Sequence, residues 1–165
     1  MDDKTPKDDK FVHGIKIFLA VMMFMITAVT FYQIIMRYVF RRAPYWSEEL
    51  VRFTFVWITL IGAAIGIREK IHIGIDLLVA RLPEKWQKYS RILVNCAICF
   101  FAGFIIYYGY QVSLATLNQP SPALKISMSY VYAGLPVGGA LMIYFAVKEI
   151  INEFKNKPAP QGEVE

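Results

Sequence analysis

Charge is missing from four long stretches of this 165-residue chain: residues 17–36, 53–67, 92–124 and 126–147 contain no Asp, Glu, Lys or Arg. This pattern excludes an ordinary soluble domain, because 56% of the side chains are hydrophobic, against about 45–50% in soluble domains. A helix needs roughly 20 apolar residues to cross about 30 Å of hydrocarbon. The first and fourth stretches therefore each predict one membrane span, and the third predicts one span and a loop.

The uncharged stretches also lack the groups that several membrane functions need. A proton-coupled multidrug exporter of this size needs an acidic residue inside a span, and a haem-carrying respiratory anchor needs axial histidines in the bundle. His13 precedes the first stretch and His72 lies in a connector. No Gly-rich phosphate loop, nucleophile elbow or metal-ligand row occurs. We therefore expect no cofactor, no bound metal and no enzymatic activity.

Cysteine is scarce, and Cys96 and Cys99 form a C-x-x-C pattern inside the third uncharged stretch. A reactive or metal-binding thiol is stabilised as thiolate by a nearby cation or metal. The neighbouring residues are apolar or uncharged, with no Lys, Arg or His among them. We interpret the two residues as buried, inert thiols.

Lysine and arginine are unevenly distributed among the connectors. Those before the first helix, in residues 68–91 and from residue 148 onward total 13, against 5 in residues 37–52 and at Lys125. The positive-inside rule then places both termini and the 68–91 connector in the cytoplasm. The opening segment mixes acidic and basic residues and precedes a long apolar run, so we expect no cleavable signal peptide. The net charge of +5 gathers at helix ends, which indicates contact with phospholipid headgroups rather than nucleic acid.

The sequence thus predicts an all-α integral membrane protein with four transmembrane helices and both termini inside. The second helix should open at Ser47, a good N-cap followed by two acidic residues that suit the positive end of the helix dipole. Pro136 should kink the fourth helix. The expected spans, within a membrane domain at 11–155, lie at about 14–40, 47–67, 85–117 and 127–154.

Outside these spans we expect disordered tails at 1–10 and 156–165, which lack apolar periodicity. The connector between the second and third spans is ambiguous between strand and helix. An isolated strand beside a membrane would leave its backbone unpaired, so we expect an amphipathic interfacial helix at about 69–82.

The second uncharged stretch is short, since 15 residues cover only about 22 Å. Either Arg52 and Arg68 snorkel to the headgroups, or the helix carries Glu48, Glu49 and Arg52 toward membrane depth. In the second case Glu48 and Arg52 are spaced to pair, and the cluster must face protein or water.

For the other candidate contacts the sequence allows more than one interpretation. Arg37 and Arg41 share a helix face and bind either lipid phosphate, or the two glutamates across the turn, or an acidic partner. Residues 68, 72 and 76 form either a solvated face or an anchor for a partner. The candidates for partner or lipid contact are Arg37, Arg41, Arg42, Trp46, Glu48, Glu49, Arg52, Arg68, His72 and Asp76.

Glycine spacing marks the second and fourth helices. Gly62 with Gly66, and Gly134 with Gly138, form small-x-x-x-small patterns that allow close approach of helix backbones in lipid. The sequence leaves open whether these glycines pack the four helices together or contact another subunit.

Residues 37–83 resemble the small permease subunit, DctQ-like, of tripartite ATP-independent periplasmic (TRAP) transporters. The resemblance rests on Arg37, Pro44, the Trp-Ser-Glu-Glu-Leu row at 46–50 with Arg52, the Gly-Ala-Ala row at 62–64, and Arg68 with His72 and Asp76. Length and four helices extend it over nearly the whole chain.

The resemblance implies a scaffold subunit in the bacterial inner membrane. A large permease subunit would carry the substrate together with sodium, and a soluble periplasmic binding protein would deliver that substrate. This chain would brace the large subunit and help dock the binding protein. The implied substrate is a small organic acid, such as a dicarboxylate, a sialic acid or a sugar acid. Four helices are too few for the inverted-repeat cores of most secondary transporters. The alternative is an anchor for a non-transport complex such as a respiratory assembly.

Overall fold

The computed structural model of this protein describes residues 6–42, 44–69 and 84–155. In these ranges the backbone is helical apart from turns and one isolated bridge between Pro120 and Ser127. Four helices are long and apolar enough to cross a membrane, which confirms the predicted all-α membrane architecture. The elements are α1 (Pro6–Tyr38), α2 (Tyr45–Arg68), α4 (Glu84–Ala115), α5 (Ser129–Tyr132) and α6 (Gly134–Lys155).

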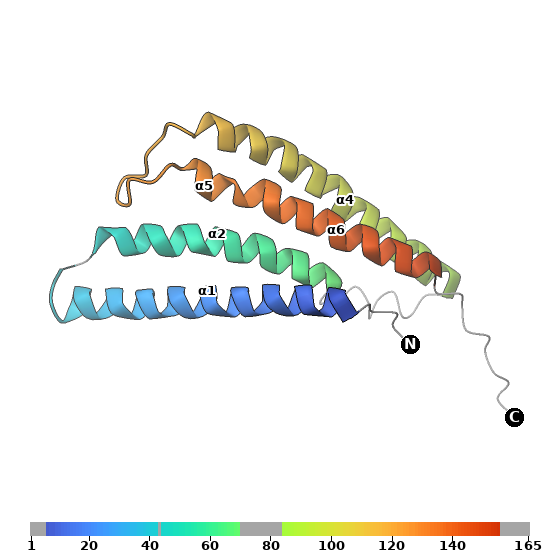
Figure 1. The fold of residues 1–165 in the computed structure, drawn as a ribbon, viewed down its shortest axis with the longest axis horizontal. Coiled ribbons are helices and arrows are strands. Elements are labelled where there is room, and N and C mark those ends of the chain that lie inside the picture. Colours follow the sequence, from blue (N-terminus) through green and yellow to red (C-terminus); the bar gives the residue numbers. More distant parts are fainter. Residues whose placement is uncertain (1–5, 43, 70–83, 156–165) are drawn as a thin grey trace, which may run out of the picture.

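The helices lie side by side in a layer, in the order α1, α2, α6, α4 (Figure 1). Helices α1 and α2 form one antiparallel hairpin, and α4 and α6 form a second. It is α6 rather than α4 that packs on α2, and the described parts of α1 and α4 have no backbone contact. The layer is therefore one helix thick, and each long helix keeps much of its apolar surface exposed.

Helix α1 packs on α2 along a single narrow seam. From residue 10 to residue 38, the eight positions that are not exposed follow one another at alternating steps of three and four residues. This spacing is the seam of a left-handed pair of nearly antiparallel helices. Most of the remaining surface of α1 is exposed. The seam consists of Val12, Ile15, Leu19, Met22, Ile26, Val29, Gln33 and Met36.

Helices α4 and α6 approach more closely, because glycines stand where they cross. A Cβ atom added to Gly109 on α4 would lie 2.5 Å from the Cβ of Leu135, and one added to Gly139 on α6 would lie 2.7 Å from Ile106. Small residues permit such backbone approach in lipid. Gly109 was not among the predicted packing glycines. The residues that it approaches, Leu135 and Pro136, lie on another helix, and the sequence around Gly109 does not reveal them.

The buried core gathers at one end of the layer. Its members come from the beginning of α1, the end of α2 and the middle of α6. The opposite end has few buried apolar side chains, Val131 on α5 among them, and is joined by hydrogen bonds between α2 and the α4–α5 region. The core cluster consists of Val12, Ala64, Ile65, Ile67, Phe145 and Ala146.

The fourth predicted span is interrupted. A turn at Ala133 separates α5 from α6, and Pro136 lies in the first turn of α6. Proline has no N–H for the carbonyl four residues earlier, that of Tyr132, so the helical hydrogen bonding is interrupted here, although Ala133 keeps helical dihedral angles (φ −60°, ψ −21°). The kink itself stays a prediction. The Trp57 indole on α2 donates to the Tyr130 carbonyl at 3.2 Å and fastens α5 to α2.

Several helix boundaries differ from those predicted. Helix α1 begins at Pro6, inside the stretch expected as a tail, and ends at Tyr38. Helix α4 ends at Ala115, two residues early. The predicted tail at 156–165, and the predicted interfacial helix from residue 70 onward, lie outside the described residues.

Candidate functional site

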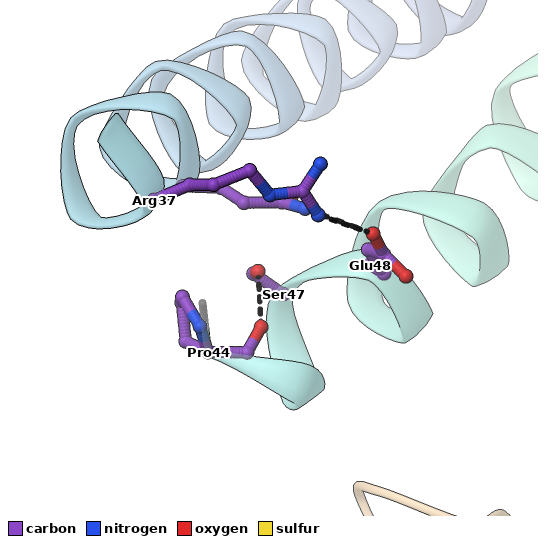
Figure 2. Close-up of polar contacts among 5 residues, drawn as sticks. Arg37, Pro44, Ser47 and Glu48 are labelled. Carbon is purple, nitrogen blue, oxygen red and sulfur yellow. Dashed lines mark hydrogen bonds and ion pairs between the residues drawn. The ribbon is translucent and has the colours of Figure 1, made fainter. Parts of the chain in front are cut away.

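Arg37 and Glu48 join α1 to α2 beside the turn that connects them (Figure 2). Arg37 lies in the last turn of α1 and Glu48 in the first turn of α2, and Nη2 of Arg37 lies 2.9 Å from Oε1 of Glu48. The side-chain amide of Gln33 donates to the same oxygen at 3.2 Å. This is the pairing across the turn that the sequence left open. No salt bridge joins Glu48 to Arg52 among the described residues.

Helix α2 begins two residues before the predicted N-cap. Pro44 occupies the cap position in an extended conformation, and the helix starts at Tyr45. The hydroxyl of Ser47 is fully buried and donates to the Pro44 carbonyl at 2.7 Å (Figure 2), instead of accepting a backbone N–H. The prediction of Ser47 as N-cap was wrong, because the fixed φ of Pro44 lets the helix begin directly after it.

Glu49 reaches a different partner, the loop between α4 and α5. Its Oε2 atom accepts hydrogen bonds from the backbone nitrogens of Ala123 at 2.9 Å and Leu124 at 2.7 Å. Lys125, the next residue, has a φ of 57°, a conformation uncommon for a residue other than glycine. A carboxylate that accepts two amide hydrogens forms strong, charge-assisted bonds. Glu49 therefore fixes this loop to α2.

Arg41 and Arg42 form the tip of the α1–α2 turn. Arg41 has a φ of 53°, and the N–H of Arg42 donates back to the Met36 carbonyl at 3.0 Å. This left-handed residue with its returning hydrogen bond ends α1. Both arginine side chains are exposed, and no salt bridge to either occurs in the described part of the chain.

Trp46 and Arg52 complete this end of the layer. The Trp46 ring lies 6.3 Å from the Tyr32 ring, tilted by 31°, and is partly exposed. Arg52 lies on the same face of α2 as Glu48, one turn farther along the helix, and is exposed. Of the predicted candidates at this end, Arg37 and Glu48 pair with each other and Glu49 binds the α4–α5 loop. Arg41, Arg42 and Arg52 are exposed.

A second ion pair, not predicted from the sequence, lies at the other end of the α1–α2 hairpin. Lys16 Nζ lies 2.9 Å from Glu69 Oε1. Position in the sequence could have indicated this pair. Lys16 directly precedes the first uncharged stretch, and Glu69 lies two residues after the end of the second. Arg68 is in the last turn of α2 and half-buried. His72 and Asp76 lie outside the described residues.

The predicted packing glycines divide into two kinds. A Cβ on Gly134 would lie 3.3 Å from the Trp57 ring, and one on Gly138 would lie 2.7 Å from the Cβ of Leu60, so both positions bring α6 close to α2. A Cβ on Gly62 would meet nothing within 4 Å. Gly66, one turn along the same helix, is partly exposed.

The two cysteines are free thiols on α4. Cys96 is exposed and Cys99 is half-buried. The expectation that both are buried was therefore wrong for Cys96, because α4 lies at the edge of the layer and, among the described helices, packs on α5 and α6 alone. Among the described residues no three His, Cys, Asp or Glu side chains come together to hold a metal ion.

Known proteins match this chain over most of its length. The family described as tripartite ATP-independent periplasmic transporters, DctQ component, matches residues 26–156. The sialic acid TRAP transporter small permease protein SiaQ of Vibrio cholerae is 32% identical over 147 residues, which cover 88% of this chain and 85% of that protein. The C4-dicarboxylate TRAP transporter small permease protein DctQ of the same organism is 37% identical over 160 residues, with 82% and 69% covered.

A longer relative contains a segment similar to this chain. The isethionate TRAP transporter permease protein DctMQ of Oleidesulfovibrio alaskensis is 28% identical over 138 residues. These residues cover 81% of this chain but only 22% of that protein. The segment similar to this chain is thus joined there to a much longer sequence.

The family match and the four membrane-spanning helices agree in what they imply. They make the chain a multi-pass protein of the bacterial inner membrane and a component of a transporter rather than an enzyme. The resemblance noted at residues 37–83 extends through the matched range to the end of α6. The chain belongs to the DctQ family, the small permease subunits of TRAP transporters.

Proposed function

We propose that this chain is the small scaffold subunit that braces the large permease subunit of a TRAP transporter. The observation that carries the proposal is the one-helix-thick layer of α1, α2, α6 and α4 (Figure 1). The helices of the described ranges, arranged in such a layer, enclose no interior through which a solute could pass. The layer instead presents two broad apolar faces, and large exposed apolar surfaces mark contacts with protein or lipid. The long relative DctMQ, in which a similar segment is part of a larger permease, supports a permanent large partner.

In the proposed orientation, both termini of the chain lie in the cytoplasm. Its support is the excess of Lys and Arg before residue 17, in the 68–91 connector and from residue 148 onward. The α1–α2 turn and the α4–α5 loop then lie on the periplasmic side, together at one end of the layer (Figure 1).

We further propose that the periplasmic end helps dock a substrate-binding protein. The exposed side chains of Arg41, Arg42 and Lys125 project there and have no salt bridge within the described chain. Guanidinium groups bind carboxylates with good geometry, so an acidic surface would fit. Replacing Arg41 and Arg42 by Glu should slow uptake while leaving the membrane complex assembled. Unchanged uptake would contradict the docking role.

The proposed substrate class is a small organic acid taken up with sodium. The support is the set of relatives, which are named for sialic acid and C4-dicarboxylates, and the family resemblance implies sodium coupling through the large subunit. Uptake by the reconstituted complex should require an inward sodium gradient, and uptake that proceeds equally with potassium would contradict it.

The test of the scaffold role is affinity purification of the tagged chain from its native membrane in mild detergent, with mass spectrometry of the eluate. We expect a large multi-span permease at a fixed ratio to the tagged chain. Recovery of the tagged chain alone, or with respiratory proteins, would contradict the scaffold role and favour an anchor of a different assembly.

A further inference from the structure

The two ion pairs of the α1–α2 hairpin mark the membrane boundaries. Lys16 and Arg37 enclose the first uncharged stretch of 20 residues, which spans about 30 Å as a helix, the thickness of the hydrocarbon. Arg37 pairs with Glu48 in the first turn of α2, and Lys16 pairs with Glu69, the residue that directly follows α2. Ion pairs of exposed side chains belong at the headgroup level rather than in hydrocarbon. Glu48 and Glu69 therefore lie at the outer and inner boundaries.

Arg52 then lies inside the outer boundary. It follows Glu48 by four residues on the same face of α2, which places its Cα about 6 Å deeper. Its side chain is exposed, and the described residues offer it no salt bridge. The nearest carboxylates along the helix are already held: Glu48 by Arg37 and Gln33, and Glu49 by the backbone amides of the α4–α5 loop. A charged side chain at this depth needs an anion from outside the chain.

Below Phe55, whose side chain is 56% exposed, the exposed positions of α2 carry small residues. The exposed positions of α2 after Trp46 are 48, 52, 55, 59 and 63. The Thr59 hydroxyl is satisfied by the Phe55 carbonyl at 2.8 Å, so Thr59 acts as a small residue. Gly62, beside Ala63, has open space where a Cβ would stand. We call Arg52, Phe55, Thr59, Gly62 and Ala63 the α2 face.

Other exposed faces of the layer look different. Helix α1 exposes Phe24 at 77% and Phe31 at 64%, and α4 exposes Phe100 at 63% and Phe101 at 65%. Such bulky side chains suit contact with lipid chains. Gly134 and Gly138 are required by close packing inside the chain, whereas Gly62 is not. A small residue that faces outward in a membrane fits the close approach of another helix.

We propose that the α2 face seats a transmembrane helix of the large permease subunit, with a carboxylate of that helix paired to Arg52. This inference rests on the proposed scaffold function and names the surface that performs it. Charge complementarity requires an acidic residue in the outer half of the partner helix, about one turn below the boundary. A phospholipid phosphate is the competing occupant, because an arginine can snorkel upward. The small residues below Arg52 favour the helix, since a lipid headgroup makes no use of them.

Photo-crosslinking distinguishes the two occupants. A benzoylphenylalanine is introduced at Phe55, or at Phe24 as the control on an outward face of α1, in the full complex in native membranes. We expect the probe at position 55 to join this chain to the large subunit, with an Asp or Glu within two turns of the crosslinked residue. The probe at position 24 should give lipid adducts. Lipid adducts alone at position 55, from a complex that still co-purifies, would overturn the α2 face and leave the scaffold role standing. Failure of the unmodified chains to co-purify would overturn both.

Matched substitutions test the two features of the α2 face. Arg52→Glu should reduce recovery of the large subunit at least tenfold, whereas Arg42→Glu, beyond the boundary, should leave it unchanged. Gly62→Leu should also reduce recovery, whereas Gly103→Leu on α4, where a Cβ likewise meets nothing within 4 Å, should not. Thermal unfolding of each purified variant controls for folding. Full recovery with both Arg52→Glu and Gly62→Leu, or equal losses with the controls, would overturn the proposal.

Discussion

Oε2 of Glu49 lies 2.7 Å from the backbone nitrogen of Leu124, although 75 positions separate the two residues. The same carboxylate oxygen also accepts the N–H of Ala123. One side chain of α2 thereby holds the loop of the other hairpin at the end of the layer that has few buried apolar residues. The apolar core lies at the opposite end, so polar contacts carry much of the connection between the hairpins here.

Glu49→Ala should loosen that loop. The change leaves the partly buried amides of Ala123 and Leu124 without an acceptor, which costs about 1–3 kcal/mol. We expect a lower unfolding temperature in detergent and faster hydrogen exchange at residues 123–124. Glu49→Gln, which keeps one carbonyl acceptor, should have a smaller effect. Unaltered exchange in Glu49→Ala would show that the loop is held by its own hydrogen bonds.

The Arg37–Glu48 pair should contribute little to the stability of the isolated subunit. The two side chains are 50% and 57% exposed, and exposed ion pairs typically contribute about 0–1 kcal/mol. A double-mutant cycle with Arg37→Ala and Glu48→Ala, followed by unfolding in detergent, measures the coupling. A coupling energy well above 1 kcal/mol would mean that the pair is shielded from solvent in the detergent-bound protein.

Gly138→Ala should destabilise the subunit, whereas Gly62→Ala should not. The new Cβ at position 138 would lie 2.7 Å from the Cβ of Leu60 and force α6 away from α2, and overpacking typically costs about 1–3 kcal/mol. At position 62 the Cβ meets open space, and alanine favours a helix over glycine by up to about 1 kcal/mol. Unfolding of both purified variants gives the comparison, and equal stabilities would contradict the close packing of α2 and α6.

The proposed orientation predicts which engineered thiols are accessible. In a chain with Cys96→Ala and Cys99→Ala, Asn118→Cys in the α4–α5 region should react with a membrane-impermeant maleimide in cells with a permeabilised outer membrane. Asn152→Cys near the end of α6 should react only after the inner membrane is opened. Both positions are exposed in the folded chain. The reverse labelling pattern would place the termini in the periplasm.

Much of the architecture was predictable because it follows from local composition. Uncharged stretches long enough to cross a bilayer determine the spans, and turn residues such as Pro44 lie between them. Local pattern was less reliable at the ends of helices. Ser47 has the chemistry of an N-cap, yet its hydroxyl donates to Pro44, since the geometry of the preceding proline set the helix start.

The candidate site was predictable in its members but not in its contacts. Arg37, Glu48 and Glu49 were recognisable as charges at the edge of a span. Which of them pair inside the chain depended on the distance between helices, and the sequence offered Arg52 and Arg37 equally to Glu48. The Lys16–Glu69 pair was not predictable, because in the sequence each residue is an ordinary charge at the end of a span. The pairing follows only from the packing of α1 beside α2.

The sequence by itself determined that this protein crosses the membrane four times and belongs to a family of transporter subunits, because both follow from residue types and their order along the chain. Only the tertiary structure decided that α6 lies between α2 and α4, that Glu49 holds a loop 74 positions away, and that Gly138 packs inward while Gly62 faces out. The physical reason is that a small-x-x-x-small pattern or a flanking charge is the same in either environment. Its meaning depends on which helix face is turned toward a neighbour, and that is settled by the packing of elements far apart in the chain.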